Sequence, residues 1–146
     1  ALDIDRAEGY LGSAGGCLGY ATGISHCSSS YESNPLLGWN LELDTYYNRG
    51  LDPTQADHIA FTIDAKIDQP ILWAEIPNIE DGEWHTIHVQ VSQSHVYVTL
   101  DGVVYLDDDI NASLNFPAYV GFTATTGALH NYHLIDELSV TETICE

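Results

Sequence analysis

Short runs of alternating apolar and polar residues recur along the chain, and each run is bounded by Gly, Asp, Asn or Pro. No stretch of ten or more residues repeats its apolar positions at the helical period. An alternation with period two is typical of strands that bury one face. From residue 38 onward the pattern predicts six or seven strands, at residues 38–45, 59–63, 84–91, 96–100, 103–106, 119–125 and 133–140. The sequence therefore predicts an all-β protein.

The pleat and the turns of these predicted strands follow from single residues. In residues 38–45, Leu41 and Leu43 alternate with polar positions, which places Glu42 and Asp44 together on a polar face. Residues 92–95 are expected to turn between two strands of a hairpin. Asp101-Gly102 predicts the next tight turn, because this pair accepts the positive φ angles that a two-residue hairpin turn requires.

Two segments are predicted to be loops. Residues 107–109 are three consecutive Asp residues and are expected to begin a loop after the strand at 103–106. Residues 11–38 are rich in Gly and Ser, with few alternating apolar positions, and are expected to form long surface loops. Loops of this length in a compact domain usually bind something.

Length and charge narrow the class of protein. The 146 residues fit one domain, with residues 1–38 as Gly/Ser-rich loops and residues 39–146 supplying the strands. The 22 acidic residues face only Arg6, Arg49 and Lys66, which gives a formal charge of −19. A nucleic-acid binder needs basic side chains to contact phosphates, so this class is excluded, and no apolar run is long enough for a membrane helix. The acidity fits a solubilising surface, or one that attracts cations.

The cysteines and one tripeptide favour an extracellular or cell-surface location. Cys17 and Cys27 lie in the same Gly/Ser-rich stretch and are expected to form a disulfide, which requires an oxidising compartment. Cys145 is then left over, either free or paired with another chain or segment. Asn111-Ala112-Ser113 is a candidate N-glycosylation acceptor.

Candidate metal ligands gather in one segment of the sequence. Glu42, Asp44, Tyr46 and Asn48 occupy alternate positions of a strand that runs into a loop, and Asp52 and His58 follow. Calcium binds several hard oxygen ligands from carboxylates, amides and backbone carbonyls, whereas an imidazole suits a transition ion. The spacing alone fits a metal site and an acidic strand edge with a hydrogen-bonded histidine equally well.

This segment resembles the metal-binding region of L-type (legume-lectin-like) lectins, which reads Glu-x-Asp-x-aromatic-x-Asn, a short loop, Asp-Pro and then His. The resemblance implies a concanavalin A-like antiparallel β-sandwich (jelly roll) with bound Ca²⁺. It also implies that Asp44 and Asp52 bridge two ions, and that the Tyr46 carbonyl and Asn48 complete the calcium site. Glu42 and His58 would hold the second ion, Mn²⁺ or another transition metal.

Two further segments resemble parts of the same family. Gly12-Ser13-Ala14-Gly15-Gly16-Cys17-Leu18-Gly19-Tyr20 is similar to its glycine-rich sugar-contacting loop, in which a backbone amide approaches the ligand. Residues 120–127 and 131–133 are similar to its late core strand and the variable loop after it, and residues 81–85 to a segment common among concanavalin-like sandwiches. The carbohydrate-binding residues that the resemblance implies are Gly15, Gly16, Tyr46, Asn48, Leu129 and His130.

The chain departs from the family at its beginning. Only about ten residues precede the glycine-rich loop, so the early strands and the sugar-binding Asp of the family are missing. A sandwich without these strands exposes unpaired edges and apolar faces. Another chain or segment supplies them, the domain pairs with copies of itself, or the sandwich is smaller and rearranged; we expect one of the first two.

Three functions from different classes follow. The leading hypothesis is a non-enzymatic, calcium-dependent glycan-binding (lectin or adhesin) module. The second is a structural subunit of an extracellular assembly or filament that uses a lectin-like fold. The third is a glycoside hydrolase, since related sandwiches carry Glu-x-Asp-x-x-Glu on a strand with two catalytic carboxylates. Glu42 and Asp44 fit that motif, but Tyr47 stands at its third position and cannot act as the acid.

Overall fold

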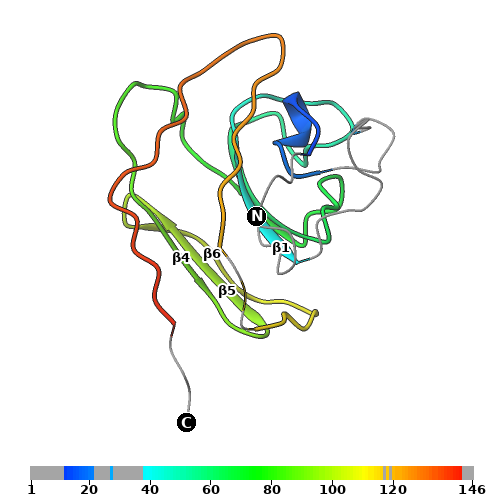
Figure 1. Cartoon of the computed structure of the whole chain (residues 1–146), viewed down its shortest axis with the longest axis vertical. Helices are drawn as coiled ribbons and strands as arrows, with labels where there is room; N and C mark the ends of the chain where they lie inside the picture. The colour runs from blue at the N-terminus through cyan, green and yellow to red at the C-terminus, as the bar shows by residue number, and fades with distance from the viewer. Residues whose placement is uncertain (1–11, 22–26, 28–37, 117, 119, 143–146) are drawn as a thin grey trace.

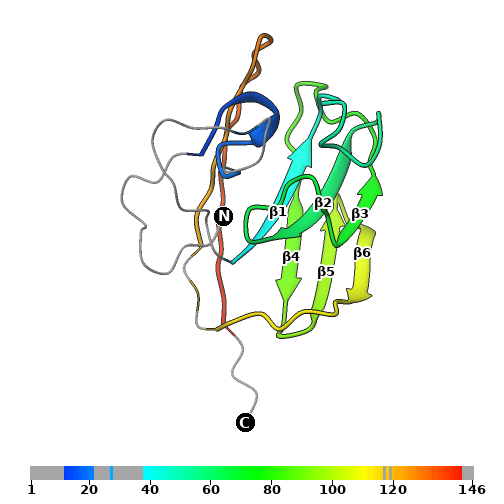
Figure 2. The same ribbon diagram turned by 90° about the vertical axis from the view of Figure 1, so that its right-hand side faces the viewer.

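The fold consists of two stacked antiparallel sheets. The computed structural model describes residues 12–21, 27, 38–116, 118 and 120–142. One three-stranded sheet contains β1 (Trp39–Asp44), β2 (His58–Ile63) and β3 (Leu72–Glu75) in that order, and the other contains β4 (Ile87–Val91), β5 (His95–Leu100) and β6 (Val103–Asp109). The sheets lie face to face (Figures 1 and 2), and a short 3-10 helix, η1 (Gly15–Cys17), precedes them. The predicted all-β sandwich is confirmed, whereas the concanavalin A-like jelly roll stays a prediction.

The main core lies between the two sheets. β2 contributes Ile59 and Phe61, both fully buried, and β5 contributes Val96 and Val98, which are equally buried. Burying a side chain of this size contributes roughly 1.5–3 kcal/mol, so these residues account for most of the adhesion between the sheets. Trp39 of β1 stacks on Phe61 with ring centroids 5.6 Å apart. The predicted inward face of residues 59–63 is thereby confirmed.

The opposite face of the first sheet is also buried, and it is polar. Its buried polar side chains come from β1 and β2; they are Asn40, Glu42, Asp44, His58 and Thr62. The predicted alternation in residues 38–45 is correct, because the polar side chains of β1 share one face and Leu41 packs toward the core. This polar face, however, lies under the glycine-rich loop and the connections after β1 and β2 rather than in solvent.

Both predicted hairpin turns are present. Asp101 and Gly102 have φ angles of 50° and 78°, so this pair adopts two consecutive left-handed conformations between β5 and β6. The amide of Ser92 donates to the carbonyl of His95 at 2.9 Å, which closes the turn between β4 and β5. β5 begins at His95, one residue earlier than predicted, and β4 begins at Ile87 rather than at residue 84.

The prediction that the acidic run at 107–109 begins a loop is wrong. β6 continues to Asp109, whose partner in the register is His95 at the start of β5. The His95 ring bonds two carboxylates, with Nδ1 2.8 Å from Asp109 Oδ1 and Nε2 3.0 Å from Asp107 Oδ1. The hydrogen bond that His95 donates to Asp109, followed by the one that it donates to Asp107, raises the pKa of His95. The His95 imidazole thus offsets the negative charge of Asp107 and Asp109, which would otherwise disfavour the pairing of β6 with β5.

Two of the predicted strands are not formed in the described residues. Residues 120–125 and 133–140 are neither helix nor strand, and their apolar side chains are largely exposed, with Phe122 at 55% and Leu134 at 69%. Their alternation is genuine, but no described strand pairs with them. A strand requires ladder hydrogen bonds as well as the pattern. Conversely, β3 was not predicted, because its four residues, within the short segment between Pro70 and Pro77, give too short a run to recognise.

The glycine-rich segment is not the surface loop that was predicted. In its described part, Cys17, Tyr20, Ala21 and Cys27 are buried and form a second small cluster with Leu51, Ala65 and Ile67. The predicted Cys17–Cys27 disulfide is present, with an S–S distance of 2.02 Å. Residues 22–26 and 28–37, and Cys145, lie outside the described residues. In the part of the chain that the structure describes, no helix has the length and apolarity needed to cross a membrane.

Candidate metal centre

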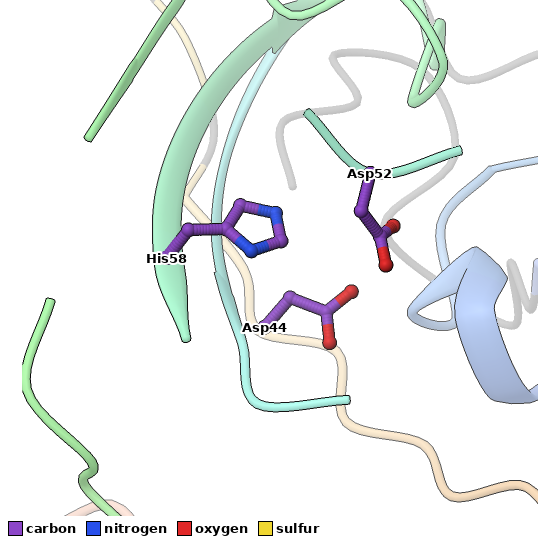
Figure 3. Close-up of side chains that lie close together, drawn as sticks. All are labelled: Asp44, Asp52 and His58. Atoms are coloured by element: carbon purple, nitrogen blue, oxygen red, sulfur yellow. The ribbon is translucent and has the colours of Figure 1, made fainter. Parts of the chain in front are cut away.

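Three acidic and imidazole side chains converge where β1 ends and β2 begins. Asp44 is the last residue of β1 and pairs in register with His58, the first residue of β2. Asp52 comes from the loop that connects the two strands. One potential ligand atom from each of these residues lies within 4.8 Å of the others, and Figure 3 shows the three side chains pointing toward one another.

His58 and Asp44 each present an unpartnered atom. The Nδ1 atom of His58 lies 3.2 Å from the carbonyl oxygen of Ala56, and because a carbonyl only accepts, this nitrogen is the one that donates. Among the described residues, His58 Nε2 has no hydrogen-bond partner although its residue is 2% exposed, and Asp44 Oδ2 is likewise buried without one. Buried polar atoms without partners are costly, and a metal ion bound between them would satisfy both.

The connecting loop is folded so that Asp52 faces this position. The backbone carbonyl of Asn48 accepts hydrogen bonds from the amides of Leu51 at 3.0 Å and Asp52 at 3.2 Å, which closes a tight turn. The amide of Asn48 donates back to Asp52 Oδ2. The amide of Tyr46 donates to Asp44 Oδ1 at 2.9 Å. The backbone therefore orients both carboxylates before any ion is bound.

The electrostatics of the centre lack a compensating positive charge. Burial raises the pKa of Asp52 to about 6 and also raises the pKa of Asp44. Both described basic side chains, Arg49 and Lys66, are exposed. A divalent cation would favour the ionised carboxylates in this location, because opposite charge offsets the cost of burial.

Glu42 lies on the same face as Asp44 but has a different partner. Its Oε2 atom accepts a hydrogen bond of 2.9 Å from the Tyr20 hydroxyl, whose oxygen also lies 3.0 Å from Thr62 Oγ1. Glu42 is 5% exposed and does not belong to the group formed by Asp44, Asp52 and His58. Burial raises its pKa to about 8. Tyr20 was not among the predicted site residues, because nothing local in the sequence indicates a contact with a residue 22 positions away.

The remaining predicted ligands lie around the centre. Asn48 is half-buried, and its side chain lies directly beside Gly16 of the glycine-rich loop. Tyr46 and Tyr47 point outward, with 58% and 40% of their surfaces exposed. Either ring is therefore accessible to a ligand, although the structure gives neither ring a stacking partner among the described residues.

The predicted sugar-contacting segments meet above the centre. The Gly15 amide donates to Thr125 Oγ1 at 2.9 Å, and Thr123 Oγ1 donates to the carbonyl of Leu18 at 2.9 Å. Residues 123–127 therefore lie against the glycine-rich loop, as both views show (Figures 1 and 2). The Gly15 amide is thus engaged by Thr125, and Leu129 and His130 are exposed just beyond this contact.

Comparisons with known proteins add little to these observations. No protein-family model matches the chain, and no solved structure gives a significant match. Among curated proteins the chain is similar to an acetylcholine receptor-like protein, cup-4, of Caenorhabditis briggsae, with 32% identity over 68 residues. This match covers 44% of the chain and 15% of the length of that protein.

Burial of Glu42 predicts that the stability of the metal-free protein declines with rising pH. The pKa of this carboxyl is raised from 4.5 to about 8, so the folded state binds the proton more tightly than the unfolded state. The resulting stabilisation is complete below pH 4.5 and is lost as the pH rises through about 8. Urea unfolding in EDTA should show a smaller loss of unfolding free energy between pH 5 and pH 8 for Glu42→Gln than for the wild type.

The exposed Glu83 provides the matched control. Glu83→Gln removes the same charge at the surface and should keep the pH dependence of the wild type. Equal pH dependence in Glu42→Gln and the wild type would contradict the role of Glu42 burial.

Proposed function

We propose that this chain is a calcium-dependent carbohydrate-binding module without enzymatic activity. The observation that supports the proposal most is the convergence of Asp44, Asp52 and His58, with Asp44 Oδ2 and His58 Nε2 buried and unpartnered. The similarity of residues 42–58 to the metal-binding region of L-type lectins includes these three residues among the six metal ligands that it implies. The glycine-rich loop and residues 123–127 lie against each other next to this centre.

Asp44, Asp52, Asn48 and the carbonyl of Tyr46 are the proposed calcium ligands. The ion would supply positive charge to a group of buried carboxylates and hold the loop between β1 and β2 in place. His58, with Nδ1 donating to Ala56, would offer Nε2 to a second ion, Mn²⁺ or another transition metal. Glu42 is the other proposed ligand of that ion. Its Oε2 atom accepts from Tyr20, so Glu42 would coordinate the ion through Oε1 or share Oε2 with Tyr20.

We propose that the glycan binds over Asn48, whose backbone is held by the hydrogen bonds of its turn and around which several side chains are exposed. Tyr46 offers an exposed ring for the apolar face of a sugar, and Leu129 and His130 are exposed at the far end of the segment that contacts Gly15. We place the module outside the cell or on its surface, because the disulfide requires oxidising conditions. Asn111 is exposed after β6, which fits its proposed glycosylation.

Metal binding is the first test of this function. Isothermal titration of the wild type with Ca²⁺ should give a saturable signal, and Asp44→Asn should weaken binding by more than about 100-fold, since loss of a ligand exceeds the usual effect of an outer residue. The affinity should also fall as the pH drops below about 6, because protons compete for Asp52. Asp68→Asn, which changes an exposed acid, is the control and should bind like the wild type. Wild type that takes up no Ca²⁺ would rule out the metal centre.

Glycan binding is the second test. On an array of glycans, binding should be lost in excess EDTA and restored by added Ca²⁺, because the ion holds the loop that carries Asn48. Asn48→Ala should abolish binding, whereas Asn115→Ala, at an exposed position outside the centre, should leave it unchanged. Binding that persists undiminished in EDTA would argue against the proposed mechanism.

A second feature favours association with further copies of the chain, and with it the alternative role as a structural subunit. β1 and β4 each have an edge without a described partner strand, and residues 120–140, which form no strand in the described part of the chain, expose a series of apolar side chains. Those exposed by at least half are Val120, Phe122, Leu129, Tyr132, Leu134, Ile135, Leu138 and Val140. Exposed apolar surface of this extent marks interaction sites in natural proteins. We propose that a second copy covers this segment.

Light scattering should therefore give a mass above that of the monomer. This mass should not change on addition of reductant if the copies are not linked by a disulfide through Cys145. Leu138→Asp places a charge at a position that is 60% exposed in this chain and should shift the protein to the monomer. Ser139→Asp adds the same charge at the neighbouring position and should change the mass distribution less. A stable wild-type monomer at all concentrations would contradict association.

A further inference from the structure

The glycine-rich loop lies in direct contact with the side chain of Asn48. A Cβ atom built on Gly16 would lie 2.4 Å from Asn48 Cγ, 2.5 Å from Oδ1 and 2.8 Å from Nδ2. These distances are shorter than side-chain carbons tolerate, so any residue other than glycine at position 16 would displace the amide. No left-handed φ is required of Gly16, and its role is therefore to allow close approach rather than a special backbone conformation.

The loop is held at this distance by contacts on its other side. The Tyr20 hydroxyl donates to Glu42 Oε2 at 2.9 Å and lies 3.0 Å from Thr62 Oγ1, and all three residues are at most 5% exposed. Tyr20 thus attaches the loop to both β1 and β2. Leu51, from the same turn as Asn48, packs into the small cluster with Cys17 and Tyr20.

The backbone of Asn48 is fixed separately. Its amide donates to Asp52 and its carbonyl accepts from Leu51 and Asp52, so the turn holds the main chain in one position. The backbone at Gly16, which does not belong to this turn, lies directly against the side-chain amide. The rotamer of Asn48 is set where these two segments meet.

We propose that the glycine-rich loop positions the Asn48 side chain, with Gly16 as the contact and the Tyr20–Glu42 hydrogen bond as the anchor. Gly16 and Tyr20 are positioning residues: they act through Asn48 and touch neither ion nor sugar in this role. The effect of the loop on ligand binding rests on the proposed function of Asn48. The effect of the loop on the orientation of the Asn48 side chain does not.

Nuclear magnetic resonance of the full chain without added ion tests the orientation. The side-chain NH₂ signals of Asn48 are assigned by their loss in Asn48→Asp. Gly16→Ala should shift these signals strongly, because the added methyl overlaps the amide, and Tyr20→Phe should broaden or shift them by releasing the loop. Asn115→Ala, at an exposed position outside the centre and the glycine-rich loop, is the control and should leave the Asn48 signals unchanged. Unchanged Asn48 signals in Gly16→Ala overturn the proposal.

Ca²⁺ titration of the same variants tests the consequence. Gly16→Ala and Tyr20→Phe should each lower the affinity by about tenfold or more, as loss of a residue that orients a ligand does, while Asn115→Ala should not. Shifted Asn48 signals together with wild-type affinity would overturn the role of the loop in binding. A wild type that binds no Ca²⁺ would instead contradict the proposed function, and the Asn48 signals would still decide whether the loop positions this side chain. If Gly16→Ala fails to fold, Tyr20→Phe adds no atoms and keeps both measurements available.

Discussion

The burial of a polar strand face under a layer of loops is the constraint on which the rest of this structure depends. The alternation of β1 sends Trp39 and Leu41 to the core between the sheets, and it sends Asn40, Glu42 and Asp44 to the other side. A buried carboxylate costs several kcal/mol unless hydrogen bonds or an opposite charge compensate. Each acid here receives a donor from a loop: Tyr20 for Glu42, the Tyr46 amide for Asp44 and the Asn48 amide for Asp52. None receives a lysine or arginine among the described residues, and this deficit of positive charge makes a divalent cation the fitting complement.

The loop layer must in turn be held on the sheet without strands of its own. The Cys17–Cys27 disulfide closes a segment of ten residues, and a closure of this length contributes about 3 kcal/mol in the chain-entropy model. The Tyr20 hydrogen bond contributes roughly 0.5–1.5 kcal/mol, as a typical intramolecular hydrogen bond does. The covalent link therefore stabilises the folded chain more than this hydrogen bond does, whereas Tyr20 determines where on the sheet the glycine-rich loop lies. This division explains why a short loop with many glycines has a defined position over Asn48.

Local chemistry was readable from the sequence, and pairing over long distances was not. The pleat of β1 and the Asp101-Gly102 turn depend on neighbours within a few residues, so pattern predicted them. The gathering of Asp44, Asp52 and His58 was indicated by the resemblance to L-type lectins, since spacing alone fitted a metal site and an acidic strand edge equally well. The alternation in residues 120–125 and 133–140 records which side chains a strand would bury but not whether a partner strand exists. The acidic end of β6 was predicted to be a loop, because the residue that stabilises it as a strand, His95, lies on another strand.

Contacts between residues distant in the sequence also decide the roles of two residues of the candidate site, Glu42 and Asp44. The two acids stand two residues apart on one strand, share one face and are almost equally buried, at 5% and 4% exposure. In the sequence they are equivalent members of one motif. In the structure the Tyr20 hydroxyl engages Glu42, while Asp44 keeps one oxygen without a partner beside His58 and Asp52. Tyr20 of the glycine-rich loop engages one acid and leaves the other to the candidate metal centre, so this loop contributes to the difference in chemistry between them.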